Sequence, residues 1–199
     1  MTAVKICGLR RKEDIEAVNK YVPDYIGFVF APSRRQVTEE KASELKKLLK
    51  PGIKTVGVFV NQDIDMITDL CRKGIIDIPQ LHGNETEADI KCIKKICDVP
   101  VIKAVSVRST EDIRRWRDSL CDILLLDNGA GGTGESFDWN LIEDINKPFF
   151  IAGGINEKNV LKALAKKPYG IDVSGGVETD GFKDPAKIKN IIETIRRGD

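Results

Sequence analysis

The stretch DILLLDNGAGGTG, residues 122–134, decides the fold class of this chain. Residues 123–126 form a continuous apolar run, which is typical of a parallel strand buried on both faces. Asp127 follows this run directly, and four glycines occupy the six positions 129–134. An acid at the end of a buried strand, followed by backbone that can approach a ligand closely, favours an active site. A polar strand end before a flexible loop is the alternative.

The same unit, a short apolar strand followed by an amphipathic helix, recurs along the whole chain. Strands are expected at residues 4–8, 24–30, 54–60, 76–81, 101–107, 121–127, 149–153 and 170–174. Helices are expected at residues 11–20, 38–50, 63–73, 85–97, 109–116 and 138–145, then after a cap at Asn156 and after a cap at Asp184. Eight such pairs joined by short connections predict a parallel α/β fold.

The number of repeats favours a single (β/α)8 TIM barrel domain over residues 1–199, because parallel barrels close at eight strands. A typical barrel has about 250 residues, so this one is expected to be compact. An open, doubly wound sheet is the alternative architecture.

Composition narrows the possible partners. Lys and Arg number 32 against 31 Asp and Glu, so the net charge of +1 gives no bulk field that would favour nucleic acid or an anionic membrane. No apolar stretch reaches transmembrane length. The five cysteines are scattered and there is one histidine, so no zinc cluster or other metal site is expected. Reduced thiols in a cytoplasm fit this pattern best.

Polar residues and glycines stand at every expected strand end, whereas the strand bodies are nearly all apolar. In a barrel, these carboxyl ends of the strands carry the chemistry. The end positions are Cys7, Arg34, Arg35, Asn61, Gln80, His82, Ser106, Asp127, Gly153, Gly154, Ser174, Gly175 and Gly176. The glycines after the seventh and eighth strands lie where barrels usually bind phosphate through backbone N–H groups, with tight turns as the alternative interpretation.

Several short motifs make this chain recognisable. They are VKICGL at 4–9, GFVFAPSRRQV at 27–37, VGVFVN at 56–61, QLHG at 80–83, LLLD at 124–127, GGTGESFDW at 131–139, AGGI at 152–155 and DVSGGVE at 172–178. In this order and at the spacing of barrel strands, the chain resembles the phosphoribosylanthranilate isomerase family of tryptophan biosynthesis along essentially its whole length. One departure is Ser174-Gly175-Gly176, where the family usually has Ser-Ser-Gly.

The resemblance implies an Amadori rearrangement of N-(5-phosphoribosyl)anthranilate to 1-(2-carboxyphenylamino)-1-deoxyribulose 5-phosphate. This chemistry needs a general acid for the ring oxygen and a general base for the C2 proton, without a metal or cofactor. By resemblance, Asp127 is the acid and Cys7 the base. The ordinary pKa of an aspartate is about 3.9, so the pKa of Asp127 is expected to be raised by burial or by a nearby negative charge.

The resemblance also assigns the substrate contacts. Arg35 would bind the anthranilate carboxylate, with Arg34 as a solvated neighbour, and the phosphate would lie at Gly153, Gly154, Ser174, Gly175 and Gly176. Gly132 and Gly134 would fold over the substrate, and His82 and Asp172 are possible further contacts. The partner expected is therefore a small phosphosugar, bound by a monomer or a homodimer.

Two other functions stay open at this stage. One is another phosphosugar isomerase or epimerase on the same scaffold. The histidine-pathway isomerase uses paired aspartates, whereas the first strand here ends in Cys7, and pentose-phosphate epimerases use several metal-binding histidines. The other is a non-catalytic phosphosugar-binding module, which would need the glycine loops but not Cys7, Asp127 and Arg35 together.

Overall fold

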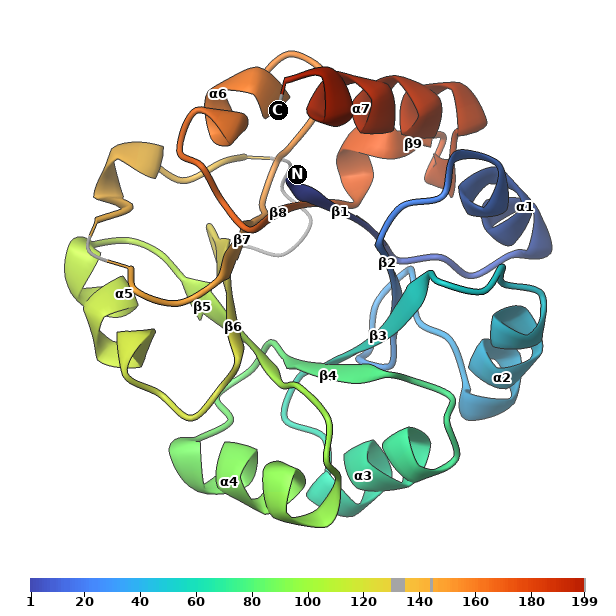
Figure 1. The fold of residues 1–199 in the computed structure, drawn as a ribbon. Coiled ribbons are helices and arrows are strands. Elements are labelled where there is room, and N and C mark those ends of the chain that lie inside the picture. Colours follow the sequence, from blue (N-terminus) through green and yellow to red (C-terminus); the bar gives the residue numbers. More distant parts are fainter. Residues whose placement is uncertain (130–134, 144, 199) are drawn as a thin grey trace.

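Eight parallel strands close into a barrel in the computed structural model, which describes residues 1–129, 135–143 and 145–198 (Figure 1). The strands pair in chain order, and β1 closes the ring by pairing in parallel with both β2 and β8. They are β1 (Ala3–Cys7), β2 (Tyr25–Val29), β3 (Lys54–Phe59), β4 (Ile78–Leu81), β5 (Ile102–Ser106), β6 (Ile123–Asp127), β7 (Phe149–Ile151) and β8 (Gly170–Val173). The predicted (β/α)8 barrel is confirmed, and the open sheet is wrong.

Alternate residues of the strands pack into two separate hydrophobic clusters, as the period of two in a β-strand requires. The smaller cluster fills the inside of the barrel and contains Ala3, Val56, Ile78, Ile102, Ala104, Ile123, Leu125, Phe150 and Ala152. The larger cluster joins the outer faces of the strands to the surrounding helices. Because both faces of the strands are buried, the strand sequences read as continuous apolar runs.

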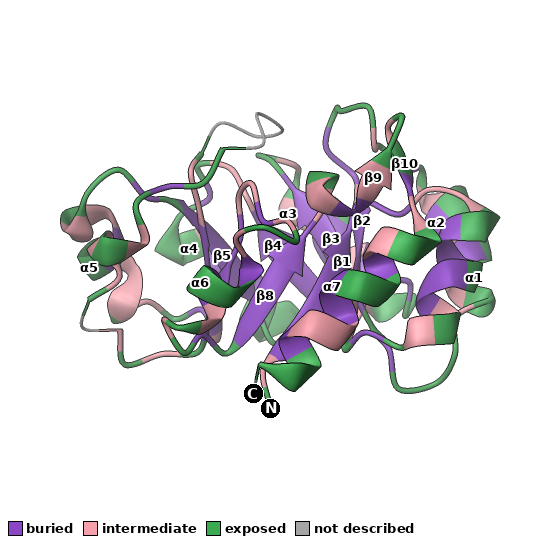
Figure 2. Cartoon of the chain, turned by 90° about the horizontal axis from the view of Figure 1, so that it is seen from above, coloured by how far each residue is buried: buried purple, intermediate pink, exposed green. Residues whose placement is uncertain are grey.

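Seven helices surround the barrel. They are α1 (Lys12–Tyr21), α2 (Glu39–Lys47), α3 (Ile64–Arg72), α4 (Glu87–Ile96), α5 (Thr110–Arg117), α6 (Val160–Leu164) and α7 (Pro185–Arg197), counted over the described ranges. Thr38 and Asp184 cap α2 and α7 through side-chain oxygens, as their positions in the sequence predict. Figure 2 shows the buried strands inside this shell, with both termini at the end of the barrel opposite the hairpin of β9 (Glu178–Thr179) and β10 (Phe182–Lys183).

Two predicted helices differ from the structure. The expected helix at residues 138–145 is only the 3-10 turn η1 (Trp139–Leu141) in the described part of that segment. After β7, the cap of α6 is Asn159 rather than Asn156, because the backbone carbonyl of Asn156 accepts from Asn159 and Val160 in a turn that precedes the helix. α6 has five residues, too few for a periodic pattern to locate its start.

The loop after β8 contains more structure than its sequence indicates. The 3-10 turn η2 (Gly175–Val177) leads into the antiparallel β9–β10 hairpin, which packs beside the mouth of the barrel. These strands have two residues each, below the length at which alternation predicts a strand. Among the described residues, no helix combines the length and apolar character that crossing a bilayer requires.

Candidate active site

Cys7 is the last residue of β1, and its side chain is buried at the mouth of the barrel. A Cβ atom at Gly27 on β2 would lie 2.5 Å from Cys7 Sγ, so only glycine at that position leaves room for the thiol. The hydroxyl of Ser174 donates to the backbone carbonyl of Cys7 over 3.0 Å and ties the loop after β8 to the end of β1. The thiol is thus held in a defined place by its two neighbouring strands.

Buried charges surround the thiol. Lys5, two residues before Cys7 and fully buried inside the barrel, donates to Asp172 Oδ2 over 2.8 Å. Burial raises the pKa of Cys7, and the positive charges of Lys5 and Lys183 oppose this rise without cancelling it. The resting form is therefore the thiol. Lys5 and Lys183 are the groups that stabilise the thiolate when it forms.

Replacing Lys5 by methionine is expected to lower the free energy of unfolding by about 3–5 kcal/mol, because the change leaves the Asp172 carboxylate buried and unpaired. The loss should appear as a lower urea midpoint with an unchanged m-value. The matched control is Lys12→Met, since Lys12 and Glu16 form an exposed pair at 3.9 Å whose contribution should be about 0–1 kcal/mol. Equal midpoints for the two variants would contradict this account of the buried pair.

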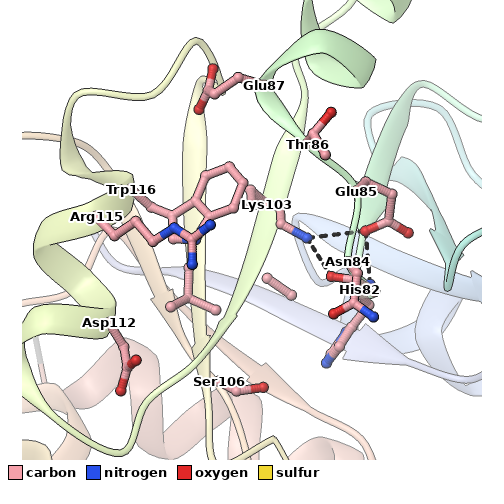
Figure 3. Close-up of a pocket in the computed structure, with 13 residues that line it drawn as sticks. His82, Asn84, Glu85, Thr86, Glu87, Lys103, Ser106, Asp112, Arg115 and Trp116 are labelled. Carbon is pink, nitrogen blue, oxygen red and sulfur yellow. Dashed lines mark hydrogen bonds and ion pairs between the residues drawn. The ribbon is translucent and has the colours of Figure 1, made fainter.

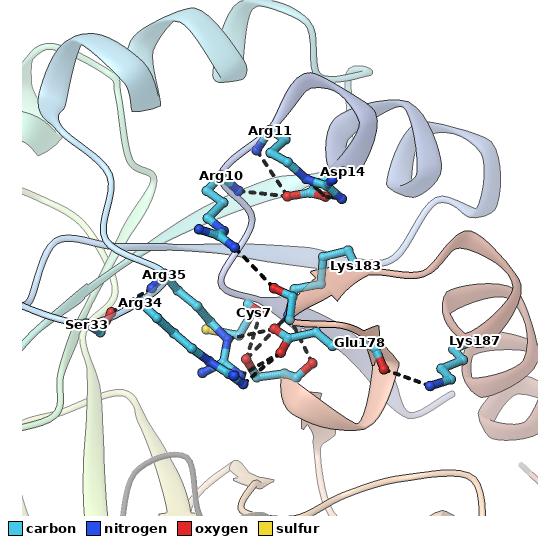
Figure 4. A network of polar contacts seen from close by, with 12 residues as sticks. Cys7, Arg10, Arg11, Asp14, Ser33, Arg34, Arg35, Glu178, Lys183 and Lys187 are labelled. Atoms are coloured by element: carbon cyan, nitrogen blue, oxygen red, sulfur yellow. Dashed lines mark hydrogen bonds and ion pairs between the residues drawn. The ribbon is translucent and has the colours of Figure 1, made fainter.

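Arg35 lies at the same side of the mouth and is held by Glu178 (Figure 4). Its Nε and Nη2 donate to the two carboxylate oxygens of Glu178 over 2.7 and 2.8 Å. Lys183, whose side chain is 1% exposed, also donates to Glu178 over 2.7 Å. Burial alone would raise the pKa of Glu178, but the hydrogen bonds from Arg35 and the Lys183 charge lower it to about 2. Glu178 is therefore a fixed anion held by Arg35 and Lys183, with Arg34 as a third, mostly exposed cation beside it.

Arg34 is exposed, in agreement with its prediction as a solvated neighbour, and it also contacts Glu178. Its side chain is 60% exposed, yet its Nη2 donates to Glu178 Oε2 over 3.0 Å. Arg35 differs because it lies against the ends of β1 and β8. A Cβ at Gly8, which has φ of +83°, would lie 2.4 Å from Arg35 Cδ, and one at Gly175 would lie 3.6 Å from its Nη2. A carboxylate bound by Arg35 would therefore share the guanidinium with Glu178.

Asp127 ends β6, which is separated from β1 by β7 and β8 around the ring. Its Oδ2 lies 3.3 Å from His82 Nε2, and the N–H of Asn128 donates to its Oδ1 over 2.7 Å. A Cβ at Gly153, where φ is +76°, would lie 2.5 Å from Asp127 Oδ1. Glycine at the end of the seventh strand thus makes room for the carboxylate of the sixth.

The prediction of a raised pKa for Asp127 is wrong for this structure. Burial does raise the pKa, but the hydrogen bond from His82 and the backbone N–H donors of Asn128 and Gly129 outweigh it, so the pKa lies below its ordinary value. The sequence could not show this, because the donor that matters most, His82, directly follows β4 and is brought beside Asp127 only by the folded barrel. The resting group is a carboxylate with a proton donor beside it.

The glycines predicted to bind phosphate come together. A Cβ at Gly176 would lie 1.9 Å from the carbonyl oxygen of Ile155, so the loops after β7 and β8 are in direct contact. Gly153 and Gly154 both have positive φ, of +76° and +65°. The hydroxyl of Ser174 donates to Cys7, and its carbonyl accepts from Lys183 over 2.9 Å. Gly132 and Gly134, predicted to fold over a substrate, lie outside the described residues.

A pocket of about 400 Å³ opens beside His82, between the β4–α4 loop and α5 (Figure 3). Its lining includes Lys103 and Trp116 on the outer side of the barrel, but neither Cys7 nor Asp127. It is therefore a side pocket, and the strand ends themselves form the candidate site. Over the described ranges, no three His, Cys, Asp or Glu side chains are grouped so as to hold a metal ion.

Sequence reasoning missed Glu178, Lys183 and Lys5. Lys183 carried a usable signal, because an acid, Glu178, stands five positions before it in the same loop and is its ion-pair partner. The sequence offers no comparable signal for the pairing of Lys5 with Asp172, whose positions are 167 residues apart.

Parallel barrels of eight strands carry their chemistry at the carboxyl ends of the strands, and in this chain that rim holds a thiol, a carboxylate and an arginine. By fold and site the chain is a (β/α)8-barrel enzyme. It belongs to the N-(5'-phosphoribosyl)anthranilate isomerase family, whose model matches residues 4–194. It is therefore an isomerase of tryptophan biosynthesis.

Individual relatives agree with this family. The chain is 46% identical to N-(5'-phosphoribosyl)anthranilate isomerase of Clostridium acetobutylicum, with 99% of each chain covered. Among solved structures, the phosphoribosylanthranilate isomerase of Thermotoga maritima is 35% identical with a TM-score of 0.89, covering 99% of this chain and all of the other. A second phosphoribosylanthranilate isomerase structure is in complex with reduced 1-(o-carboxyphenylamino)-1-deoxyribulose 5-phosphate. It is 34% identical with a TM-score of 0.87, and the match covers 99% of this chain and all of the other.

Proposed function

We propose that this chain converts N-(5'-phosphoribosyl)anthranilate to 1-(2-carboxyphenylamino)-1-deoxyribulose 5-phosphate by an Amadori rearrangement. The observation that carries the proposal is the placement of Cys7 and Asp127 at the ends of β1 and β6 of one barrel mouth, each with its own set of charged partners. The relative crystallised with a reduced form of this product supports the choice of substrate class.

Two proton transfers begin the proposed reaction, and a tautomerisation, in which C1 gains a proton and the 2-hydroxyl loses one, completes it. A proton from the Asp127 side of the mouth goes to the furanose ring oxygen, the C1–O bond breaks, and the anthranilate nitrogen forms a Schiff base. Cys7 then removes the C2 proton, which leaves an enolamine that tautomerises to the ketose. The substrate brings a phosphate and a carboxylate and excludes water, and both changes raise the pKa of Asp127 toward the value that an acid needs. The chemistry requires no metal or cofactor, because the anthranilate nitrogen holds the positive charge.

The two ends of the substrate would be bound by separate groups. The phosphate would lie at Gly153, Gly154, Ser174, Gly175 and Gly176, whose loops touch, and the anthranilate carboxylate at Arg35. His82 at the end of β4 and Asp172 within β8, where it is paired with Lys5, are proposed as further contacts. All the described candidate residues come from one chain, so a monomer and a homodimer both fit the proposal. The five free cysteines suit a cytoplasmic enzyme.

The direct test follows the anthranilate fluorescence while phosphoribosylanthranilate is generated in the assay. Turnover that depends on the chain is the expected result. Turnover only of the histidine-pathway aminoaldose would assign the chain to the other phosphosugar isomerases. Tight binding of the product analogue without turnover of either substrate would favour the binding module.

Replacing Arg35 by alanine is expected to raise KM more than it lowers kcat, because a carboxylate–guanidinium pair is made in the ground and transition states alike. A charge-assisted hydrogen bond contributes about 1.5–3 kcal/mol, so kcat/KM should fall by roughly 10–150-fold. Arg35→Lys should recover part of the lost kcat/KM, since an ammonium keeps the positive charge but cannot donate two parallel hydrogen bonds to a carboxylate. Steady-state kinetics of the three proteins measures both effects.

The matched control is Arg34→Ala, because Arg34 also donates to Glu178 but is mostly exposed. Its kinetics should be close to those of the unchanged chain. If Arg34→Ala is the damaging change and Arg35→Ala is silent, the substrate carboxylate is bound by Arg34 instead.

A further inference from the structure

Gln80 on β4 is a buried amide beside the candidate acid. It is 1% exposed, and its Nε2 lies 3.0 Å from His82 Nδ1. The other ring nitrogen, His82 Nε2, lies 3.3 Å from Asp127 Oδ2. The side chains of Gln80, His82 and Asp127 thus form one chain of polar contacts, which ends at the Asp127 carboxylate.

The direction of these hydrogen bonds follows from the atoms. An amide nitrogen carries two hydrogens and accepts nothing, so Gln80 Nε2 donates and His82 Nδ1 must accept. The ring proton of the neutral imidazole is then on Nε2, where it points to Asp127 Oδ2. Gln80 therefore determines which ring nitrogen carries the proton, and with it whether His82 can donate to the acid.

We propose that Gln80 is a positioning residue for the isomerisation: it holds His82 in the Nε2–H form, so that His82 donates to Asp127 Oδ2 and fixes the orientation of the carboxyl group, which takes up a proton on substrate binding and delivers it to the ring oxygen. The catalytic part of this inference rests on the proposed function, whereas the position of the ring proton does not. Gln80 itself is behind His82 and touches the substrate nowhere in this scheme.

Of the charged groups that the structure describes near His82, Asp127 is the one that contacts the ring. Lys103 on β5 donates to the carbonyl of Gly83 and to Glu85, and Glu85 also accepts the N–H of Asn61, so these two charges satisfy each other. The other charged groups that line the adjoining pocket are Glu87, Asp112 and Arg115 on α4 and α5 (Figure 3). Asp127 is the carboxylate within hydrogen-bonding distance of the ring.

The amide oxygen supplies a second, independent observation. Gln80 Oε1 is buried and has no hydrogen-bond partner in the described structure. An unpaired buried carbonyl lowers stability, so an apolar side chain of similar size would fold at least as well at this position. A glutamine here is thus explained by the hydrogen bond of its Nε2 and not by a contribution of the whole amide to the core.

The chain has one histidine, which makes the test direct, because the ¹⁵N spectrum of the imidazole reports on His82 alone. The unchanged chain should show a protonated Nε2 and an unprotonated Nδ1 in the neutral ring. Gln80→Leu should fold and lose the preference for a proton on Nε2 of His82. Its kcat should fall by about 2–13-fold, which is the equivalent of one neutral hydrogen bond, and its KM should change little. Gln80→Glu should instead accept from Nδ1–H, so that a protonated Nδ1 appears in the spectrum.

Gln62→Leu is the control, since Gln62 accepts the N–H of Val60 at the end of β3 and should affect neither readout. A protonated Nδ1 in the unchanged chain would overturn the inference, as would a Gln80→Leu variant with unchanged tautomer and kcat. The spectrum needs no turnover. A chain with protonated Nε2 but no isomerase activity would therefore contradict the proposed function while leaving the ring assignment standing.

Discussion

Replacing Cys7 by serine is expected to lower kcat by about 10²–10⁴-fold while substrate binding stays nearly intact, because a serine hydroxyl remains protonated and cannot accept the C2 proton. The smaller oxygen fits the space that Gly27 leaves for Cys7 Sγ, so the fold should be retained. Turnover and the Kd of a reduced product analogue, measured on the same preparation, separate the two effects. Near-normal turnover would remove Cys7 from the mechanism and make it a buried structural cysteine.

The pH dependence of kcat/KM is a second test of Cys7 as the general base. Burial raises the pKa of the Cys7 thiol, so the base is more fully ionised at high pH, and kcat/KM should still be rising above the ordinary thiol pKa of about 8.5. The matched control is Cys97→Ser. Cys97 is also buried, and its Sγ donates to the carbonyl of Thr68 over 3.5 Å, far from the barrel mouth. This control should leave kcat unchanged.

Replacing Asp127 by asparagine is expected to reduce kcat by a similar factor, about 10²–10⁴-fold, through loss of the group that delivers the proton to the ring oxygen. The amide keeps the size of the carboxylate and an acceptor for the N–H of Asn128, so the β6–β7 contact at Gly153 should survive. Furanose opening should then limit the rate. A substrate analogue prepared in the open form should be isomerised much faster than the natural substrate by this variant.

Asp122→Asn serves as the control for Asp127→Asn. Asp122 precedes the same strand at its opposite end, where it accepts from Lys94 and from the N–H of Val101. Its loss should affect stability more than turnover. If Asp127→Asn handled the pre-opened analogue no better than the natural substrate, ring opening would not be the step that Asp127 assists.

The strand ends of this protein could be located from local sequence alone. The apolar run before Asp127 and the strand that ends at Cys7 lie where the structure has β6 and β1, because burial on both faces of a parallel strand leaves a continuous apolar signal. Helix caps such as Thr38 and Asp184 could also be predicted from the sequence, since a capping side chain contacts a backbone N–H two or three positions further along the chain. Where the elements are short, prediction was less complete: the helix of α6 was predicted but its cap was placed too early, and the β9–β10 hairpin was not predicted.

By itself, then, the sequence determined the eight strand–helix repeats, whose number favoured a barrel, and the residues that stand at the strand ends, because each repeat is marked by local apolar patterns. Only the tertiary structure decided how those residues are charged. The pKa of Asp127 is lowered by His82 from β4, Glu178 is held as an anion by Arg35 from the loop after β2, and Lys5 is paired with Asp172 across the closure of the ring. Protonation depends on charges and donors within a few ångströms, and barrel closure brings those together from positions as far apart as 167 residues.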